Sequence, residues 1–329
     1  MKRSREKKAK QRLTSADVAR ASGVSRATVS YVLNKDPRQT IPAETRERVL
    51  KAARTLGYHP FAPARSLRAG YSRLVLVVVQ FEQVDPNVAR DLHYLEAGLA
   101  EHGYSLIWHV GAHLKAGLRH PSTNLTPAVV ISCADEKDPA VAAFLRQFGV
   151  PVLSMRTVTS GQAVGRTQVT YLAQKGGRRM VFAAPERRDV QRIAEARLDG
   201  VRQACAEFAL EPPLVQVMPL SRSGSRKAIG KILAHQAPPL GICCYNDEVA
   251  FAVLAALADA GISVPGSAAV IGCDDIPLAQ FSIPALTTVA FNNRQFLDLL
   301  IENVLAASHD EPTHKAPEIP LSVVTRRSA

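Results

Sequence analysis

Apolar runs of strand length alternate with helical runs throughout residues 73–329, and this alternation constrains the fold more than any other feature of the sequence. The strand-like runs are LVLVVVQ, YSLIWHV, PAVVIS and VPVLSM, followed by MVFAAP, LVQVMPL, GICCYN and AAVIGCD. Helical runs such as Val88–Glu101 and Val141–Phe148 separate them. This pattern predicts an α/β body with parallel sheets, and there are enough strand–helix units for two sheets. A ligand would lie at the carboxyl ends of the strands.

Residues 13–34 depart from this pattern and predict two short helices joined by a glycine-containing turn. Thr14 is a suitable N-cap for the first helix, and Asp17, three residues on, completes a capping-box-like pair. Gly23 is placed to end this helix, because glycine adopts the left-handed backbone conformation of a C-cap without strain.

The second helix, over Arg26–Leu33, has Ser25 as its N-cap and an apolar face formed by Val29, Val32 and Leu33. A helix-turn-helix places the start of its second helix in the major groove of DNA. The residues then placed to meet base edges or phosphates are Arg26, Ala27, Thr28 and Tyr31. The alternative interpretation is a solvated helical hairpin in an ordinary domain.

Residues 42–56 predict a third helix, with Pro42 in the first turn and Gly57 as a stop. Three helices make a minimal DNA-reading module. The following segment, YHPFAPARSLRAG (58–70), has room for one or two helical turns over 62–68, which is too short to be stable alone. We expect it to fold only against a partner and to act as a hinge; a plain interdomain linker is the alternative.

The positive charge of the chain is confined to one end. Residues 1–72 hold 17 Lys and Arg against 5 Asp and Glu, whereas the rest of the chain has 24 residues of each sign. Duplex DNA is a polyanion with one charge per about 1.7 Å of axis. Because only residues 1–72 carry excess positive charge, only this segment is suited to bind it. The run KRSREKKAKQR is expected to be a disordered arm that adds phosphate or minor-groove contacts.

The remaining composition restricts the class of protein. With 329 residues and 47% hydrophobic content, the chain can bury a sizeable core in more than one domain. The longest apolar run, Leu74–Val79, is far shorter than a membrane span, and the lysine-rich start lacks the apolar core of a signal peptide. We therefore expect a cytoplasmic protein whose five scattered cysteines are buried, reduced thiols.

Catalytic motifs are missing from the sequence. The first strand is not followed by a Gly-rich fingerprint, and neither G-x-S-x-G nor a Walker A motif occurs. The nine histidines show no metal-ligand spacing, and we interpret the cluster of His109, His113 and His120 as part of a solvated loop. The sequence therefore predicts no enzymatic activity and no cofactor.

The runs TSADVARASGVSRATVSYVLN, PAETRERVLKAARTLGYHP and ARSL together resemble the DNA-binding end of the LacI/GalR family of bacterial transcription regulators. Four downstream runs resemble the effector-domain signatures of the family in the same order: ARLDGVRQACAEFAL, YNDEVAFAVLAALADAGISVP, AAVIGCDDIPLAQFSIPALTTV and LSVVTRRSA. The resemblance implies an all-α helix-turn-helix headpiece and an α/β body of two Rossmann-like, parallel-sheet subdomains, similar to periplasmic binding proteins.

The resemblance also assigns DNA contacts. Major-groove reading falls to Arg26, Ala27 and Tyr31. The other predicted DNA-binding residues, mostly phosphate contacts, are Thr14, Ser25, Thr28, Ser30, Asn34 and Arg65. Leu67 matches the residue that two subunits wedge into the central base step from the minor groove, which bends the DNA. Phe61, Pro63 and Tyr31 depart from the usual family residues, so the operator is expected to differ from typical family sites.

Polar residues follow several of the predicted strands, where a ligand would bind. The predicted effector-binding set is Gln80, Phe81, Arg156, Arg197, Asn246 and Asp274. Within this set the resemblance supports Arg197, at the head of a helical run, together with Asn246 and Asp274. We expect Asp247 and Asp275 instead to cap helices or to hold loops in place.

The effector region departs from the family pattern in three places, one of which is that the segment Thr157–Gly165 lacks the usual Asp-Asn pair. Arg156 stands where Asp is common, and the stretch between Val110 and Ala128 is shortened. Either the effector is anionic or otherwise unusual rather than a neutral sugar, or ligand control has been lost.

The sequence thus predicts a homodimeric repressor that binds a pseudo-palindromic operator, bends it and responds to a small-molecule effector. The alternatives are a ligand-independent DNA-bending or nucleoid-type protein whose body only dimerises and, more remotely, an α/β enzyme with a DNA-binding arm. The expected boundaries are an arm at 1–12, a helix-turn-helix domain at 13–58, a hinge at 59–72 and a body at 73–329. Within the body, subdomain N would cover about 73–157 plus 290–320, and subdomain C about 158–289 plus 321–329.

Overall fold

The structure is a computed structural model that describes residues 13–34, 40–58, 72–110, 125–136, 138–155, 161–176 and 179–329. It divides into two compact units, Met1–Ser72 and Arg73–Ala329, which we call the headpiece and the body. Several predictions lie outside the described residues: the basic arm, the hinge with Arg65 and Leu67, and Arg156.

The headpiece contains the three predicted helices, α1 (Ser15–Ser22), α2 (Arg26–Asn34) and α3 (Ala43–Leu56). Gly23 and Gly57 end α1 and α3 with φ values of 67° and 64°, in the left-handed region that favours glycine. Pro42 is the N-cap of α3 rather than a residue of its first turn. A small core formed by Val18, Ala19, Val29, Val32, Val49 and Ala53 holds the three helices together.

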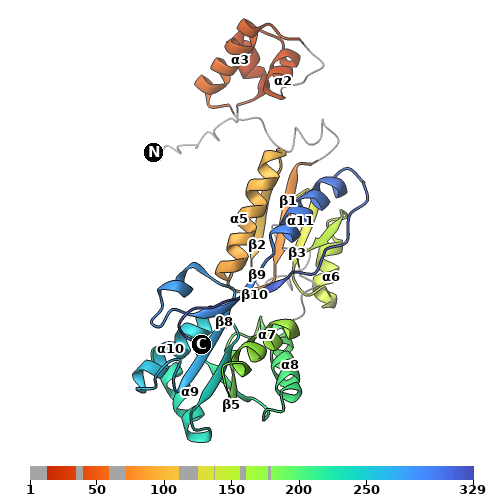
Figure 1. The fold of residues 1–329 in the computed structure, drawn as a ribbon. Helices are drawn as coiled ribbons and strands as arrows, with labels where there is room; N and C mark the ends of the chain where they lie inside the picture. Colours follow the sequence, from red (N-terminus) through yellow and green to blue (C-terminus); the bar gives the residue numbers. More distant parts are fainter. Residues whose placement is uncertain are drawn as a thin grey trace, which may run out of the picture. The chain divides into compact units, whose positions relative to one another are not determined.

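The body contains two sheets (Figure 1). The first has the strand order β2-β1-β3-β4, and all of its pairs are parallel. Its strands are β1 (Leu74–Val79), β2 (Ser105–Val110), β3 (Val129–Cys133) and β4 (Val152–Ser154). Alternate β1 residues face opposite sides of the sheet. Val75, Val77 and Val79 pack with α5 (Pro86–Glu101) and α11 (Arg294–Ala307), while Leu76 and Val78 pack with α6 (Pro139–Arg146).

The second sheet has the strand order β10-β9-β8-β7-β5-β6. Its strands are β5 (Arg179–Pro185), β6 (Leu214–Met218), β7 (Leu240–Cys244), β8 (Ala268–Cys273), β9 (Thr287–Phe291) and β10 (Leu321–Val324). The accompanying helices are α7 (Gly161–Ala173), α8 (Gln191–Glu207), α9 (Arg222–His235) and α10 (Asp247–Asp259), with the 3-10 helix η3 (Pro277–Phe281). One pair corrects the expectation of purely parallel sheets: β10 runs antiparallel to β9, because α11, which lies between them in the chain, packs against the first sheet and does not form a crossover on the second.

The chain therefore passes between the two sheets more than once. It builds the first sheet with α5 and α6, then β5 to β9 of the second sheet, then α11 against the first sheet, and finally β10. We call these groups of elements the first half and the second half of the body. Phe81 and Phe291 pack against the hydrophobic clusters of both halves. Since residues 80–82 directly follow β1, the carboxyl end of the first sheet faces the second half.

Candidate functional site

Helix α2 is held so that its first turn is presented to solvent. The Ser25 hydroxyl accepts a hydrogen bond from the Thr28 backbone N–H (3.1 Å) and bonds the Thr28 hydroxyl (2.9 Å), so Ser25 is the N-cap that the sequence predicts. Val29 and Val32 are buried against α1 and α3. The opposite side of α2 is free of core contacts, and this orientation is what a reading helix needs.

The predicted DNA-binding residues differ in exposure. Ser25, Arg26 and Ala27 are exposed, whereas Thr28, Ser30 and Tyr31 are half-buried. Thr14 is exposed at the start of α1, where its N–H and hydroxyl both donate to the Asp17 carboxylate (2.9 and 2.8 Å). These hydrogen bonds lower the pKa of Asp17. Asn34 is the last residue of α2.

In the body, the structure brings two of the predicted effector residues together. An Arg197 nitrogen lies 3.7 Å from the Asp274 carboxylate, and both side chains are buried. The guanidinium also donates to the Tyr245 carbonyl and lies 4.6 Å from the centre of the Tyr245 ring. Tyr245 directly follows β7 and Asp274 directly follows β8, so the ends of two neighbouring strands supply both partners.

Arg197 does not head a helix, which corrects the prediction from sequence. Helix α8 begins at Gln191, and Arg197 lies in its second turn, with Ala194, Leu198 and Val201 buried alongside it. The sequence did not indicate that this side of α8 is buried, because a charged residue such as Arg197 is seldom buried. Its Nε atom is buried and has no hydrogen-bond partner among the described residues.

The other predicted effector residues are engaged within the protein. Asn246 is the N-cap of α10, and its side-chain oxygen accepts from the Val249 N–H at 3.0 Å. The Gln80 side-chain oxygen accepts from the Asp135 N–H at 2.8 Å and so ties two loops of the first half. Phe81 lies where the cores of both halves meet.

Burial changes the acidity of two carboxyl groups near this site. It raises the pKa of Asp274 to about 7, and the attraction of the Arg197 guanidinium, which lies 3.7 Å from the carboxylate, opposes this only in part. Burial likewise raises the pKa of Asp247 to about 6, against hydrogen bonds from Thr288 and the Ile276 backbone. A carboxyl group at Asp274 can therefore either accept or donate a hydrogen bond near neutral pH.

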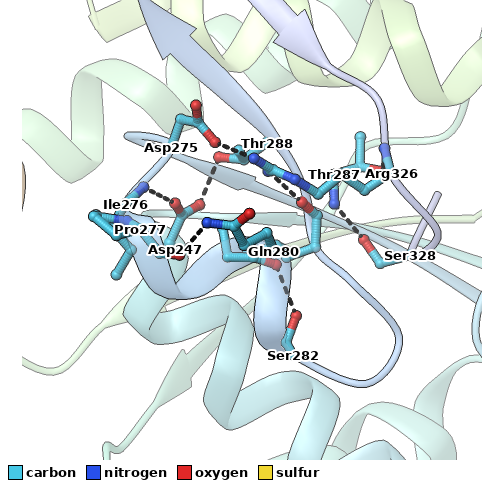
Figure 2. Close-up of polar contacts among 12 residues, drawn as sticks. Asp247, Asp275, Ile276, Pro277, Gln280, Ser282, Thr287, Thr288, Arg326 and Ser328 are labelled. Atoms are coloured by element: carbon cyan, nitrogen blue, oxygen red, sulfur yellow. Dashed lines mark hydrogen bonds and ion pairs between the residues drawn. The ribbon is translucent and has the colours of Figure 1, made fainter.

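Asp247 and Asp275 tie loops, as expected (Figure 2). The Asp247 carboxylate is buried and accepts from the Ile276 N–H (2.9 Å) and the Thr288 hydroxyl (2.5 Å). The Asp275 carboxylate accepts from the Arg326 guanidinium at 2.7 Å.

A bridge between the two halves was missed by the sequence analysis. Arg187, after β5, pairs with Asp85 of the first half, donates to the Gln83 carbonyl (3.1 Å) and forms two bonds to Asp189 (2.8 and 3.2 Å). Asp189 in turn accepts from the Glu82 N–H at 2.9 Å. The rule that functional groups follow the carboxyl ends of strands applies to residues 186–189 as well and could have found them.

The described residues also limit other kinds of site. A hollow of about 280 Å³ between β4, α11 and residues 313–316 is lined by none of the predicted effector residues. No group of three or more His, Cys, Asp or Glu in the described ranges is placed to hold a metal ion. None of the helices in this part of the chain combines the length and hydropathy of a membrane span.

A helix-turn-helix unit with an exposed reading helix, followed by a two-sheet α/β body with buried polar groups at its strand ends, defines a DNA-binding regulator with a ligand-binding body. Comparison with known proteins places the family. Residues 14–60 match the model of bacterial regulatory proteins of the lacI family, and residues 169–329 match the periplasmic binding protein-like domain. The chain therefore combines a lacI-family DNA-binding domain with a periplasmic binding protein-like domain, and the relatives it matches are transcriptional repressors.

Relatives and solved structures agree with this placement. The HTH-type transcriptional repressor PurR of Mannheimia succiniciproducens is 27% identical over 96% of this chain and 98% of its own length. A crystal structure of the Lac repressor bound to ONPG superposes with a TM-score of 0.79 at 22% identity, covering 97% of this chain and all of that one. The Lac repressor dimer bound to operator and the anti-inducer ONPF gives a TM-score of 0.77, also at 22% identity, over 97% and 99% of the two chains.

Proposed function

We propose that this protein is a dimeric repressor that acts in the cytoplasm on a pseudo-palindromic operator, with one α2 helix per subunit in the major groove. The exposed first turn of α2, held in place by the Ser25 cap and the buried Val29 and Val32, carries the proposal. The confinement of excess positive charge to residues 1–72 supports it, because neutralised phosphates supply affinity that does not depend on sequence.

Two apolar surfaces support self-association of the body. In the second half, Leu278, Phe281 and Ile283 are 62%, 72% and 92% exposed; we call them the η3 patch. In the first half, the edge strand β2 exposes Ile107, Trp108 and Val110. Exposed apolar groups of this size mark interaction surfaces, and a two-fold dimer uses the same surface on both subunits. The similar fold of the Lac repressor, which was solved as a dimer bound to operator, supports the same assembly.

A small polar effector would bind at Arg197, Asn246 and Asp274. The supporting observation is the buried Arg197 Nε, because an unpaired buried donor costs about 1–3 kcal/mol that a ligand oxygen would recover. Gln80, Phe81 and Arg156 belong to the same proposal from sequence. The effector would change the angle between the two halves and thereby order or release the hinge, whose Leu67 would wedge into the minor groove.

The alternative is a DNA-bending protein without ligand control, whose body only dimerises. The Arg187 bridge favours it in one respect, because these contacts join the two halves through protein groups alone. A thermal-shift screen of small carboxylates, phosphates and sugars separates the two proposals. A ligand that stabilises the wild type but not Arg197→Met supports effector control, and a screen in which nothing binds supports the alternative.

Selection from random DNA with the purified protein tests the DNA-binding proposal. We expect a motif with two-fold symmetry. Arg26→Ala should relax base preference at one position in each half-site by about 1–3 kcal/mol. The control is Arg48→Ala, which removes an exposed arginine from α3 and should leave the motif unchanged. An unsymmetrical wild-type motif contradicts the dimer, and an unchanged motif for Arg26→Ala contradicts its reading role.

A further inference from the structure

Residues 274–284 connect the proposed ligand site to the η3 patch. Asp274 pairs with Arg197, and the exposed Leu278 follows only four residues later. Asp274 and Asp275 have φ values of 110° and 47°, a region that side chains other than glycine seldom occupy. Surrounding contacts must therefore hold the start of this segment in place.

The end of the chain supplies those contacts on one side (Figure 2). The Arg326 guanidinium donates to the Asp275 carboxylate (2.7 Å) and to the Leu286 carbonyl (2.8 Å), so one side chain contacts the start of the segment and a residue just beyond its end. The Arg326 N–H donates to the Thr287 hydroxyl at 2.9 Å. Ser328 is fully buried, and its hydroxyl accepts from the Thr287 N–H and donates to the Val270 carbonyl (2.8 and 2.6 Å). The terminal residues are thus anchored in the second sheet.

Other elements hold the same segment from further directions. Asp247, the first residue of α10, accepts from the Ile276 N–H, and a Cβ on Gly272 would come within 2.2 Å of its carboxylate. Arg90 on α5 of the first half donates to the Asp275 carbonyl at 3.4 Å. Asp275 is therefore contacted by the chain terminus and by the other half of the body, and its neighbour Asp274 faces Arg197.

The patch itself is held mainly by short-range contacts. Gln280 donates to the Pro277 carbonyl (3.2 Å), and the Ser282 hydroxyl donates to the Ala279 and Pro284 carbonyls (3.1 and 2.9 Å). These bonds fix the shape of the turn, and its position on the body depends on Ala279, which is buried in the core of the second half, together with the anchors at its two ends. The Asp275 and Arg326 side chains are both partly exposed, and their pair fixes where the start of the segment lies relative to residues 325–328.

We propose that Arg326 is a positioning residue for self-association, and that its pair with Asp275 couples the ligand site at Asp274 to the η3 patch. Ligand binding and dimerisation are then linked, each changing the affinity of the other by the same factor. This inference rests on the proposed dimer and names its regulation.

The matched pair Arg326→Gln and Arg327→Gln tests the positioning role. Both remove one positive charge from the same strand end, but Arg327 is exposed, and its backbone N–H rather than its side chain bonds Ala285, the residue just after the segment. Sedimentation velocity over a dilution series should show a dimer dissociation constant about tenfold higher for Arg326→Gln and unchanged for Arg327→Gln, with closely similar melting temperatures. Equal constants for the two variants would overturn the inference.

Two further measurements separate the possible failures. If Arg326→Gln does not fold, Asp275→Asn removes the same ion pair from the other side and should weaken the dimer alike; an unweakened Asp275→Asn dimer would overturn the positioning role. A wild type that is monomeric at every concentration instead overturns the proposed dimer, and the inference with it.

The coupling is tested by a double-mutant cycle that uses Asp274→Asn as the change in the ligand site. In the wild-type background this substitution should shift the dimer dissociation constant several-fold, and in the Arg326→Gln background the shift should largely disappear. Additive effects of the two substitutions would overturn the coupling.

Discussion

The headpiece and the body carry their functional groups in opposite ways. In the headpiece, Arg26 and Ala27 lie on the surface of a helix whose core is on its other side, so the residues proposed to read DNA are not the ones that stabilise the fold. In the body, Arg197 and Asp274 are buried, so the groups proposed to bind a ligand also contribute to the free energy of folding. A polyanion can be met by exposed side chains, whereas a small ligand is bound by groups shielded from water.

The largest effect should come from breaking the headpiece core. Val29→Asp places a charge among buried apolar side chains. The free-energy cost of burying this charge should exceed the stability of such a small core. We expect operator binding to be lost in a gel-shift assay while the thermal transition of the body is unchanged. The exposed substitution Ala27→Asp is the control, since it should weaken DNA binding without unfolding the headpiece. A shift in the transition of the body would contradict the separation of the two units.

The next largest effect should come from Arg197→Met, which leaves the Asp274 carboxylate without its partner. Removing one member of a buried pair typically costs about 3–5 kcal/mol. Urea unfolding at pH 8 should show a loss of this order, and a smaller loss at pH 6, where Asp274 can take up a proton. Arg202→Met, on the exposed side of the same helix, is the control. Equal losses at the two pH values would show that Asp274 does not titrate in this range.

The smallest effect concerns the pH dependence of stability. The folded state raises the pKa of Asp274 from about 4 to about 7 and therefore binds its proton more tightly than the unfolded chain does. This contribution to stability is complete below the unfolded pKa and is lost as the pH rises through 7. Asp274→Asn should flatten the stability profile between pH 5 and 8.5 by on the order of 1 kcal/mol or more. Asp199→Asn, an exposed carboxylate on α8, should keep the wild-type slope, and parallel profiles for Asp274→Asn and wild type would refute the assignment.

The sequence predicts those parts of the fold that local signals determine, namely the helix ends and the buried strands. Ser25, Gly23 and Gly57 act on their own helices, and apolar runs such as Leu74–Val79 form strands wherever they pack. These features depend only on neighbouring residues. The antiparallel strand β10 was not foreseen because its four residues are all half-buried and lack a fully apolar run.

Contacts between distant segments explain what the sequence could not predict about the site. Nothing local to Arg187 shows that its partners are Asp85 and the Gln83 carbonyl, about a hundred positions earlier. Asn246 was placed at the right strand end, yet its side-chain oxygen caps α10, a use that depends on where the helix begins. A sequence predicts which polar groups lie near one another better than it predicts which of them form hydrogen bonds with one another.

The return of the last strand also orders events during synthesis. A ribosome releases the headpiece and β1 to β4 early, whereas Arg326 and Ser328 emerge only after β10. The second sheet cannot complete its buried hydrogen bonds before then, because Ser328 bonds both Val270 and Thr287. A nascent chain thus has its DNA-reading helix long before its proposed pairing surface is fixed. We expect nascent chains that have not yet released Arg326 and Ser328 from the ribosome to remain monomeric.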